Sequence, residues 1–356
     1  MGPCAACEHE RMSRIGILTG GGDCPGLNAV IRAVVRQGAG RLGHEIVGFR
    51  RGWAGVLEAA TVELTPAAVS GILHRGGTIL GSSRTNPYKD SADGAASVRS
   101  TMKQLGLDGL IAIGGDDTLG VASRLTAAGV PVVGVPKTID NDIAGTDVTF
   151  GFNTAVQIAT DAIDRLHSTT ESHDRVMVVE VMGRHAGWIA AHSGLAGGAD
   201  LILVPEHPFE IDAVCDALRR RHTQVRSFSI VVVSEGAALA GNGELSTIGG
   251  ELDAFGHARL GGIANYLERE IEERTGYETR TTVLGHIQRG GTPTAYDRVL
   301  ATRFGLAAID AVHAGRFGVM TALRGTEIVL ADLEEALAAP KLLDREFYAS
   351  TEVFFG

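Results

Sequence analysis

The stretch that decides the fold is Val130–Asp142, with the sequence VPVVGVPKTIDND. Its first half, Val130–Val135, is short, β-branched and uninterrupted, which is typical of a strand buried on both faces of a parallel sheet. Its second half, Pro136–Asp142, brings two carboxylates and one lysine directly after that strand. Ligands of parallel α/β sheets bind beyond the carboxyl ends of the strands. We therefore expect a functional site at this point.

Two aspartates in this stretch are candidates for acid–base chemistry. Asp140 and Asp142 are two positions apart, so their side chains point the same way if the backbone is extended. One carboxylate could then take a proton while the other holds or orients it. Alternatively, these residues and Asn141 only build a turn by bonding their own backbone. Both interpretations stay open from this stretch alone.

A second feature is a glycine-rich turn near the N-terminus. The pattern predicts a strand at Arg14–Thr19, a turn at Gly20–Gly26 with the sequence GGGDCPG, and a helix from Leu27 to about Gly38. This order presents backbone N–H groups to a phosphate at a helix N-terminus. The spacing fits neither the Walker loop nor GxGxxG, and a tight turn without a ligand also uses glycines.

A third feature is a pair of adjacent carboxylates, Asp116 and Asp117, behind the predicted buried strand Gly109–Ile113 and two glycines. Like charges so close repel each other unless a cation is present, and Mg²⁺ is the natural candidate beside phosphate. The alternative is that either aspartate caps the following helix. Arg84 ends another glycine-broken loop and is either a phosphate clamp or an ordinary surface arginine.

The second half of the chain continues the alternation of helices and strands. A helix is predicted from Phe152 to about Thr169 and another from about Arg259 to Thr275, and residues 237–257 are predicted to be a loop. Further strands are predicted at Arg175–Arg184, Asp200–Glu206, Phe228–Gly236 and Arg280–Leu284. The pattern predicts a second doubly wound α/β lobe.

Basic side chains gather at the ends of these later strands. They are Arg175, Arg184, Arg280, His286 and Arg289. Arginine forks match phosphate and carboxylate geometry, so the set indicates a phosphorylated, otherwise uncharged substrate such as a sugar phosphate. Any single one of them could equally be a solvated surface residue.

Composition narrows the class of protein. At 356 residues the chain exceeds the usual size of a single core, so two lobes with a cleft between them are expected. A net charge of −10 argues against nucleic acid as a partner, and no apolar run is long enough for a membrane span or a signal peptide, so we expect a cytoplasmic protein. Cys4 and Cys7 form one isolated CxxC, for which a metal or redox role is a minor alternative.

Four motifs together resemble the 6-phosphofructokinase family, and most closely its actinobacterial, pyrophosphate-dependent type. They are Gly20–Ala29, Pro136–Asp142, Met182–Arg184 and Gly285–Gly291, and the resemblance covers Ile15 to about Gly325. It implies two doubly wound α/β/α lobes with the active site in the cleft between them. The phosphoryl donor and Mg²⁺ would bind the first lobe, and fructose 6-phosphate the second.

The resemblance also implies roles for single residues. Asp140 resembles the general base for the C1 hydroxyl of the sugar, and Asp116 the carboxylate associated with Mg²⁺. The donor contact it implies is Gly22, and we add Asp117, Lys137 and the loop arginine Arg84 as candidate donor contacts. The sugar contacts it implies are Thr138, Ile139, Asp140, Arg175, Met182, Gly183, Arg184, Glu235, Arg280, His286, Ile287, Gln288 and Arg289. Arg175 and Arg280 match arginines that reach the sugar phosphate from a neighbouring subunit, so a homo-oligomer, dimer or tetramer, with shared sites is implied.

Two positions decide the donor. Typical ATP-using members resemble this chain but have glycine where it has Asp117 and Lys137. A carboxylate at 117 would fill the space of a nucleotide's α-phosphate and repel its charge, whereas Lys137 would hold a small phosphate leaving group. Some ATP-using relatives share the lysine, so Asp117 decides. We predict transfer from pyrophosphate to fructose 6-phosphate, giving fructose 1,6-bisphosphate and phosphate reversibly.

The sequence also leaves alternative functions open and predicts where the two lobes begin and end. The first alternative is the ATP-dependent enzyme, and a non-catalytic sugar-phosphate regulator or a lipid or NAD kinase is more distant. Ala60, Gln224 and Phe228 stand where allosteric members have basic residues, so we expect no allostery of that kind. We expect a disordered extension at residues 1–13, a donor and Mg²⁺ lobe at about 14–150 plus 290–335, a sugar lobe at about 151–289, and a tail at about 336–356.

Overall fold

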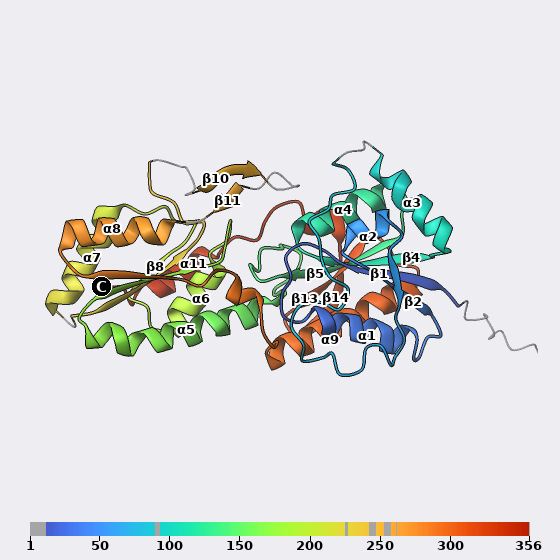
Figure 1. Cartoon of the computed structure of the whole chain (residues 1–356), viewed down its shortest axis with the longest axis horizontal. Helices are drawn as coiled ribbons and strands as arrows, with labels where there is room; N and C mark the ends of the chain where they lie inside the picture. The colour runs from blue at the N-terminus through green and yellow to red at the C-terminus, as the bar shows by residue number, and fades with distance from the viewer. Residues whose placement is uncertain are drawn as a thin grey trace, which may run out of the picture. The chain divides into compact units, whose positions relative to one another are not determined.

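The structure, a computed structural model, describes residues 12–89, 93–224, 227–241, 247–252, 258–260 and 262–355. The chain divides into two compact units (Figure 1). Unit 1 comprises the chain up to Lys137 together with Gly145–Asp147 and Arg298–Ala338. Unit 2 comprises Thr138–Ala144, Val148–Asp297 and the chain from Ala339 onward.

Unit 1 is built on a mostly parallel sheet with the strand order β14-β13-β5-β4-β1-β2-β3. The inner strands are parallel, and β3 and β14 add antiparallel edges. The strands are β1 (Arg14–Thr19), β2 (Glu45–Phe49), β3 (Thr61–Glu63), β4 (Gly109–Gly114), β5 (Val132–Thr138), β13 (Val319–Arg324) and β14 (Glu327–Asp332). The helices are α1 (Leu27–Gly38), α2 (Trp53–Leu57), α3 (Gly94–Leu105), α4 (Asp116–Ala127), α9 (Ala295–His313) and α10 (Leu333–Ala336).

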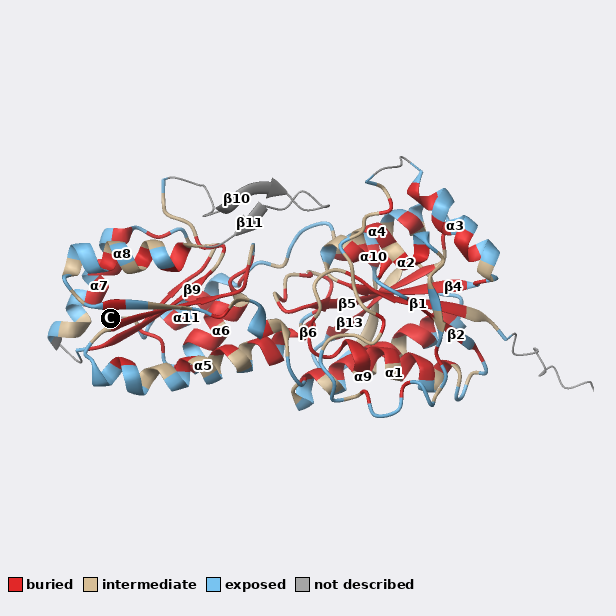
Figure 2. Cartoon of the chain, viewed as in Figure 1, coloured by how far each residue is buried: buried red, intermediate tan, exposed pale blue. Residues whose placement is uncertain are grey.

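Helices cover both faces of this sheet, with α1 and α9 on one side and α3 and α4 on the other (Figure 1). Every residue of β4 and β5 is buried, which explains their continuous apolar sequences (Figure 2). Strand β5 continues beyond the predicted end at Val135, so that Pro136, Lys137 and Thr138 are part of the strand. The carboxyl ends of β1, β4 and β5 therefore meet at one edge of the sheet.

Unit 2 contains a fully parallel sheet with the order β12-β7-β9-β8. Its strands are β7 (Val176–Val181), β8 (Leu201–Leu203), β9 (Ser229–Ser234) and β12 (Thr279–Val283). Its helices are α5 (Phe152–Ser172), α6 (Trp188–Ala196), α7 (Ile211–Gln224), α8 (Ile263–Thr275), α11 (Arg345–Glu352) and the 3-10 turn η1 (Gly285–Arg289). The remaining strands that the structure describes are β6 (Phe150–Gly151), β10 (Thr247–Leu252) and β11 (Ala258–Leu260).

The core of unit 2 lies between its sheet and the helix pair α7 and α8. Apolar side chains of both strands and helices interdigitate there, including Val178, Val231, Leu218, Leu267 and Ile271. Helix α5 covers the opposite face of the sheet (Figure 1). The α/β fold predicted for both halves of the chain is confirmed, with a parallel sheet in each unit.

The prediction of a loop across residues 237–257 was wrong in part. Strand β10 occupies Thr247–Leu252 and pairs with β11, and helix α8 starts only at Ile263 rather than near Arg259. Gly249 and Gly250 lie within β10, so the sequence there lacks the alternation of apolar and polar residues that identifies a strand.

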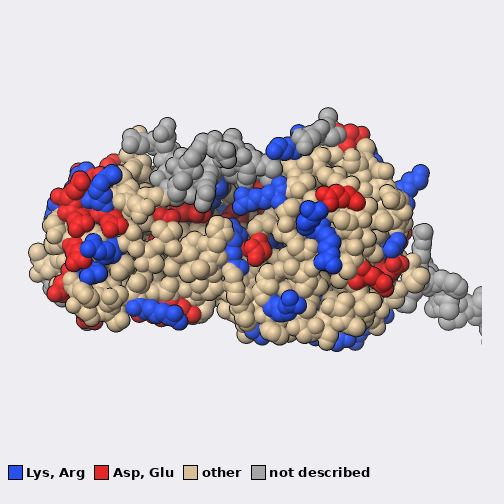
Figure 3. All heavy atoms as spheres, in the orientation of Figure 1, with Lys and Arg blue, Asp and Glu red and all other residues tan. Residues whose placement is uncertain are grey.

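Charged side chains gather over α7 and α8, at the left end of Figure 3. Arg274 lies between the carboxylates of Asp212 and Glu270, at 2.7 and 3.0 Å, and Arg219 pairs with Asp216 at 2.8 Å. Opposite charges are interleaved there, so this face carries no large field of one sign.

Three sequence-based expectations concern the ends of the chain and membranes. The CxxC of Cys4 and Cys7 lies outside the described residues, as does nearly all of the expected extension 1–13. Among the residues that the structure describes, no helix is long and apolar enough to cross a bilayer. Residues 345–352, which the sequence analysis assigned to a tail, form helix α11 within unit 2.

Candidate active site

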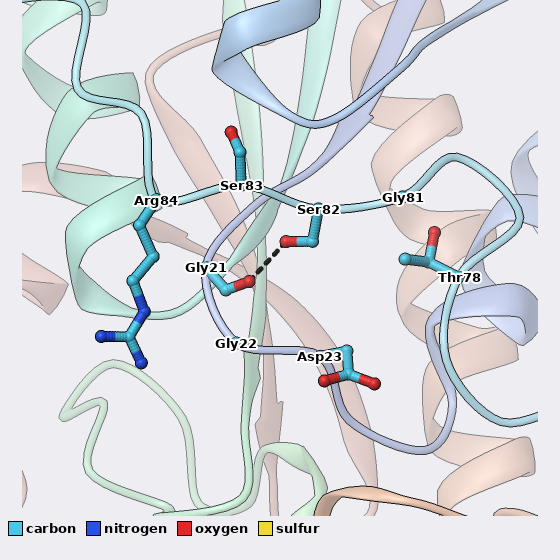
Figure 4. A pocket seen from close by; sticks show the side chains of 8 residues that line it. All are labelled: Gly21, Gly22, Asp23, Thr78, Gly81, Ser82, Ser83 and Arg84. Atoms are coloured by element: carbon cyan, nitrogen blue, oxygen red, sulfur yellow. Dashed lines mark hydrogen bonds between the residues drawn. The ribbon is translucent and has the colours of Figure 1, made fainter.

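The glycine turn after β1 is fixed by backbone hydrogen bonds to two neighbouring segments. The amide of Gly20 donates to the carbonyl of Ile113 in β4 at 2.9 Å, and the amide of Gly21 donates to the carbonyl of Ser83 at 3.1 Å. The hydroxyl of Ser82 points at the carbonyl of Gly21 and donates to it (Figure 4). Gly21 has a φ of 76°, a conformation that glycine adopts without strain.

Thr118, in the first turn of α4, explains why two of these positions must be glycine. A Cβ added at Gly20 would lie 2.6 Å from the Thr118 Oγ1, and one added at Gly114 would lie 2.3 Å from the Thr118 Cβ. The turn after β1 and the turn after β4 therefore pack directly on one threonine side chain. The glycines allow a close approach that no other residue would permit.

A pocket of about 460 Å³ opens between the glycine turn and the loop that ends at Arg84 (Figure 4). Its lining combines backbone groups of glycines with hydroxyl and charged side chains: Gly21, Gly22, Asp23, Thr78, Gly81, Ser82, Ser83 and Arg84. The sequence-predicted residues Gly22 and Arg84 thus line the same pocket. Its small polar groups suit an anion such as phosphate.

Asp116 and Asp117 occupy the first turn of α4, immediately beyond β4. Gly115 is the N-cap of this helix and no side chain caps it, so neither aspartate acts as the cap that the alternative interpretation required. Both carboxylates still benefit from the positive end of the helix dipole. Asp116 is exposed and Asp117 is partly exposed, so both can meet a ligand.

Lys137 reaches from β5 into the glycine turn. Its side chain is only 3% exposed, and its ammonium group donates a hydrogen bond to the carbonyl of Gly22. A Cβ added at Gly21 would lie 3.8 Å from its Nζ. A buried ammonium requires such a partner, and this bond holds a positive charge beside Gly21 and Gly22, which line the pocket.

The residues of unit 1 fit a divalent metal ion held mainly by its ligand. Among the described residues there is no group of three or more histidines, cysteines and acids that could enclose a metal. Mg²⁺ is commonly bound by one or two carboxylates together with substrate phosphates and water. The exposed carboxylate of Asp116 provides an oxygen ligand of this kind.

In unit 2, the backbone is not extended from Asp140 to Asp142, so the condition for their side chains to point the same way is not met. Asn141 has a φ of 56°, in the left-handed region, so the chain turns between the two aspartates. The Asn141 Oδ1 accepts a hydrogen bond from the amide of Thr149 at 3.0 Å, which stabilises the turn. Asn141 therefore has the turn-building role of the alternative interpretation.

The residues just before this turn are anchored in the fold. The amide of Asp140 donates to the Thr138 Oγ1 at 3.1 Å, and the Thr149 hydroxyl donates to the Thr138 carbonyl at 2.8 Å. The side chain of Ile139 is fully buried. Ile139 therefore supports the loop and offers a ligand only its backbone.

The loops after β7 and β9 are packed so closely that both need glycine. Gly183 has a φ of 136°, and a Cβ there would lie 2.6 Å from the Ser234 Oγ. A Cβ at Gly236 would lie 1.9 Å from the carbonyl oxygen of Arg184. This packing places Arg184 and Glu235 at neighbouring strand ends, beyond the carboxyl edge of the sheet.

Glu235 is an acid whose pKa is strongly raised. Burial, and then the charge of Asp140, raise the pKa of Glu235 to about 7. Burial also raises the pKa of Glu180, which accepts a hydrogen bond from the amide of Ala264 at 3.0 Å. The charges of Asp140 and Glu180 thus both raise the pKa of Glu235, which lies near neutral pH.

The segment after β12 forms the 3-10 turn η1, which presents different side chains in different directions. His286 is exposed and Arg289 is partly exposed, as expected for ligand contacts. Gln288 is fully buried, and its Oε1 accepts from the amide of Met182 at 3.4 Å. Gln288 thus joins η1 to the end of β7, whereas the side chain of Ile287 is 60% exposed.

The structure separates Arg175 and Arg280 from these residues. Arg175 precedes β7 and Arg280 lies at the start of β12, so both are at the amino edge of the unit 2 sheet. The six residues of β7 span roughly 20 Å, at about 3.3 Å per residue. Both arginines pair with Glu278, at 3.2 and 2.9 Å. They cannot join the carboxyl-edge residues of the same chain around one small ligand.

Comparison with known proteins identifies this arrangement. The sequence profile described as "Phosphofructokinase" matches residues 14–312. The chain belongs to the phosphofructokinase family. Members of this family generally use a divalent metal ion.

Relatives within the phosphofructokinase family carry the names of two different donors. "Pyrophosphate--fructose 6-phosphate 1-phosphotransferase" of Amycolatopsis methanolica is 62% identical over 96% of this chain and 100% of its own length. "ATP-dependent 6-phosphofructokinase 3" of Streptomyces coelicolor is 56% identical over 95% of this chain and 99% of its own.

A solved phosphofructokinase supports the fold assignment. The structure of Pichia pastoris phosphofructokinase in the T-state matches 98% of this chain with a TM-score of 0.84 and 32% identity. The chain spans 39% of the length of that yeast chain.

Some residues at this phosphofructokinase site were not identified from the sequence. Thr118 packs under two glycine turns, and Thr78 and Ser82 line the pocket beside Gly21. The clue for Thr118 was the presence of glycines after both β1 and β4, because paired glycines indicate that something approaches closely. No comparable motif marks Thr78 or Ser82.

Proposed function

We propose that this chain transfers a phosphoryl group from pyrophosphate to the C1 hydroxyl of fructose 6-phosphate, giving fructose 1,6-bisphosphate and phosphate, in both directions. The observation that carries the proposal is the geometry of the donor side. A buried lysine, Lys137, is bonded to the Gly22 carbonyl, and the carboxylate of Asp117 lies in the adjoining first turn of α4. The high identity to a pyrophosphate-named relative supports the same donor.

On the donor side, each group has a role in holding a small anion and rejecting a nucleotide. The backbone of Gly22 and the guanidinium of Arg84 contact the donor phosphates, and Lys137 stabilises the leaving phosphate as a compact cation. Asp117 repels the α-phosphate of ATP and occupies its space. Pyrophosphate has no adenosine to accommodate, so the carboxylate of Asp117 does not exclude it from the site.

Mg²⁺ is the metal that the site suits best. Asp116 would hold it together with phosphate oxygens and water. When bound, the ion neutralises charge on the phosphoryl group being transferred.

On the sugar side, Asp140 takes the proton from the C1 hydroxyl, and Thr138 binds the same end of the sugar. Arg184, Glu235 and the backbone of Met182 and Gly183 contact the sugar itself. With a pKa of about 7, Glu235 can either donate a hydrogen bond to a sugar hydroxyl or accept one from it near neutral pH.

The remaining sugar contacts bind the 6-phosphate. His286 and Arg289 hold it from η1, where Ile287 and Gln288 shape the turn. Arg175 and Arg280 contact the 6-phosphate bound to a neighbouring subunit, because their place at the opposite edge of the sheet excludes them from their own site. The active form is therefore a homo-oligomer with shared sites.

The covalent chain limits how far apart the two sets of groups can be. Lys137 and Asp140 are three residues apart, so their Cα atoms are separated by at most about 11 Å. A donor held by Lys137 and a hydroxyl activated by Asp140 can therefore belong to one transfer.

The second candidate is the same reaction with ATP as donor, which the name of the 56% identical relative favours. A coupled assay on fructose 6-phosphate with pyrophosphate, with ATP or with no added donor separates the possibilities. We expect product with pyrophosphate and little with ATP. Product with ATP alone would establish the second candidate, and no product with either donor would favour a non-catalytic sugar-phosphate regulator.

A further inference from the structure

A C-terminal segment, which we call the strap (Ala339–Leu343), lies against the Asp140 turn within unit 2. Pro340 forms an antiparallel bridge with Ile143, and the amide of Lys341 donates to the carbonyl of Asp142 at 2.8 Å. The strap lies beyond residue 312, where the match to the family ends. The family match therefore does not include the contacts that the strap makes in this structure.

The side chain of Lys341 makes a second bond to the same turn. Its Nζ donates to the Asn141 Oδ1 at 3.1 Å, and this oxygen also accepts from the amide of Thr149. A hydrogen bond from an ammonium group is about twice as strong as one between neutral groups. The Asn141 side chain is 3% exposed, so water competes little for this bond.

The strap is itself anchored on both sides of Lys341. The indole of Trp188 donates to the Lys341 carbonyl at 3.0 Å, and the Lys341 Nζ lies 5.4 Å from the centre of the same ring. The amide of Leu343 donates to Glu206 at 2.8 Å, and Glu206 also accepts from the amide of Gly187 at 3.0 Å. The lysine therefore projects from a fixed backbone.

Helix α11 fastens the end of the strap to the body of unit 2. The ring of Phe347 stacks on His192 with centroids 4.6 Å apart, and Tyr348 stacks on His207 at 4.4 Å. The Tyr348 hydroxyl donates to the carbonyl of Ile202 in β8 at 2.9 Å. The strap is thus held between the sheet of unit 2 and the Asp140 turn.

We propose that Lys341 is a positioning residue for Asp140, acting through Asn141. Thr138 holds the amide of Asp140 on one side, and the Lys341–Asn141–Thr149 contacts hold the turn on the other. Catalysis by a positioned base depends steeply on its placement, and a displacement near 1 Å can lower the rate by about 10²-fold. This inference rests on the proposed role of Asp140 as the base.

The test compares Lys341→Met, Lys341→Arg and Leu342→Ala. Methionine keeps the unbranched stem along Trp188 but removes the ammonium, arginine restores a cation, and Leu342 is a half-exposed neighbour on the same strap. We expect Lys341→Met to lower kcat by ~10-fold, with KM for both substrates changed less than ~3-fold, because a charge-assisted bond to the turn is lost while none of the proposed substrate contacts is removed. Lys341→Arg should recover most of the loss, and Leu342→Ala should behave as wild type.

Hydrogen exchange provides a readout that does not depend on catalysis. The amides of Thr149 and Lys341 should exchange ~10-fold faster or more in Lys341→Met than in wild type, while amides of the unit 2 sheet stay protected. If Lys341→Met does not fold, Trp188→Phe replaces it, since it removes the donor to the Lys341 carbonyl and keeps an aromatic ring.

The outcomes separate this inference from the proposed function. An active wild type with unchanged kcat in Lys341→Met, or unchanged exchange at Thr149, overturns the role of Lys341. Equal losses in Lys341→Met, Lys341→Arg and Leu342→Ala also overturn it, because they indicate general loosening of the strap. A wild type that transfers no phosphoryl group overturns the proposed function instead, and the exchange comparison then decides alone whether Lys341 holds the turn.

Discussion

The two units use the carboxyl edge of a parallel sheet in different ways. In unit 1 the candidate anion site adjoins tightly packed backbone, with Gly20 and Gly114 so close to Thr118 that a Cβ would clash. In unit 2 the corresponding edge presents side chains, among them Arg184 and Glu235, whose pKa is raised to about 7. The carboxyl edge of unit 1 thus combines closely packed backbone with the cations Lys137 and Arg84, whereas that of unit 2 is defined mainly by charged side chains.

This difference predicts how each unit responds to mutation. A glycine turn tolerates almost no added atoms, so substitutions there change packing before they change charge. Side chains at strand ends can be neutralised at nearly constant shape, which isolates the electrostatic contribution of each group. The sharpest experiments are therefore isosteric changes in unit 2.

The largest expected effect is that of Asp140→Asn, which keeps the shape of the side chain but removes the base. We expect kcat to fall by at least ~10²-fold, the low end for general base catalysis, while fructose 6-phosphate binding stays nearly intact. Steady-state kinetics and calorimetric titration of the sugar phosphate measure the two quantities. A variant that keeps more than about a tenth of wild-type turnover would show that another group takes the proton.

An intermediate effect is expected at the amino edge of the unit 2 sheet. Arg175→Ala and Arg280→Ala should each weaken fructose 6-phosphate binding by about 10- to 100-fold, because a charge-assisted phosphate contact contributes roughly 1.5–3 kcal/mol. Glu278→Gln is the matched control, since it removes the ion pairs of both arginines and keeps the arginines themselves. Titration of the sugar phosphate into each variant checks the prediction.

Mixing variants tests whether these arginines serve a neighbouring subunit. Arg175→Ala and Arg289→Ala change opposite edges of the sheet, so a mixed oligomer would contain some sites with both edges intact. Activity should return on mixing these two variants. Arg175→Ala mixed with Arg280→Ala should recover nothing, because both changes lie at the same edge. A fully active monomer would refute the shared site.

The smallest expected effect concerns the buried acid Glu235. The folded chain keeps a proton on Glu235 up to pH about 7, whereas the unfolded chain releases it near the ordinary pKa of 4.5, so the free energy of unfolding falls as pH rises through this window. Glutamine has no carboxyl group to ionise, so Glu235→Gln avoids this loss of stability at high pH. Without ligand, its melting temperature should exceed that of wild type by about 2–5 °C at pH 8 and match it at pH 4.5. An equal shift at both pH values would mean that ionisation of Glu235 costs the fold nothing.

Much of unit 1 was predictable from the sequence because its elements carry local patterns. Strand β1 and helix α1 have the predicted bounds, since an apolar run, a glycine turn and an amphipathic run follow one another directly. Strand β5 extends past its predicted end because Lys137 and Thr138 are polar yet buried, which apolar periodicity does not register.

The features that were missed depend on contacts between distant parts of the chain. The strap meets the Asp140 turn across some 200 residues of sequence, and no local motif in Ala339–Leu343 indicates that contact. The separation of Arg175 from Arg184, by contrast, follows from the sequence, because the two residues flank one predicted strand and so lie at opposite edges of the sheet. A turn at Asn141 was one of two open interpretations, and the left-handed backbone conformation of this residue distinguishes them.

The most direct test of the central claim measures kcat/KM for pyrophosphate and for ATP in wild type and in Asp117→Gly. Two unit charges about 4 Å apart at an effective dielectric near 20 interact by roughly 4 kcal/mol, so removing the Asp117 carboxylate could raise ATP affinity by several decades. We expect wild type to prefer pyrophosphate strongly, and Asp117→Gly to gain ATP activity and lose pyrophosphate activity. A wild type that already prefers ATP, or a variant that gains no ATP activity, would contradict the assignment of Asp117 as the residue that selects the donor.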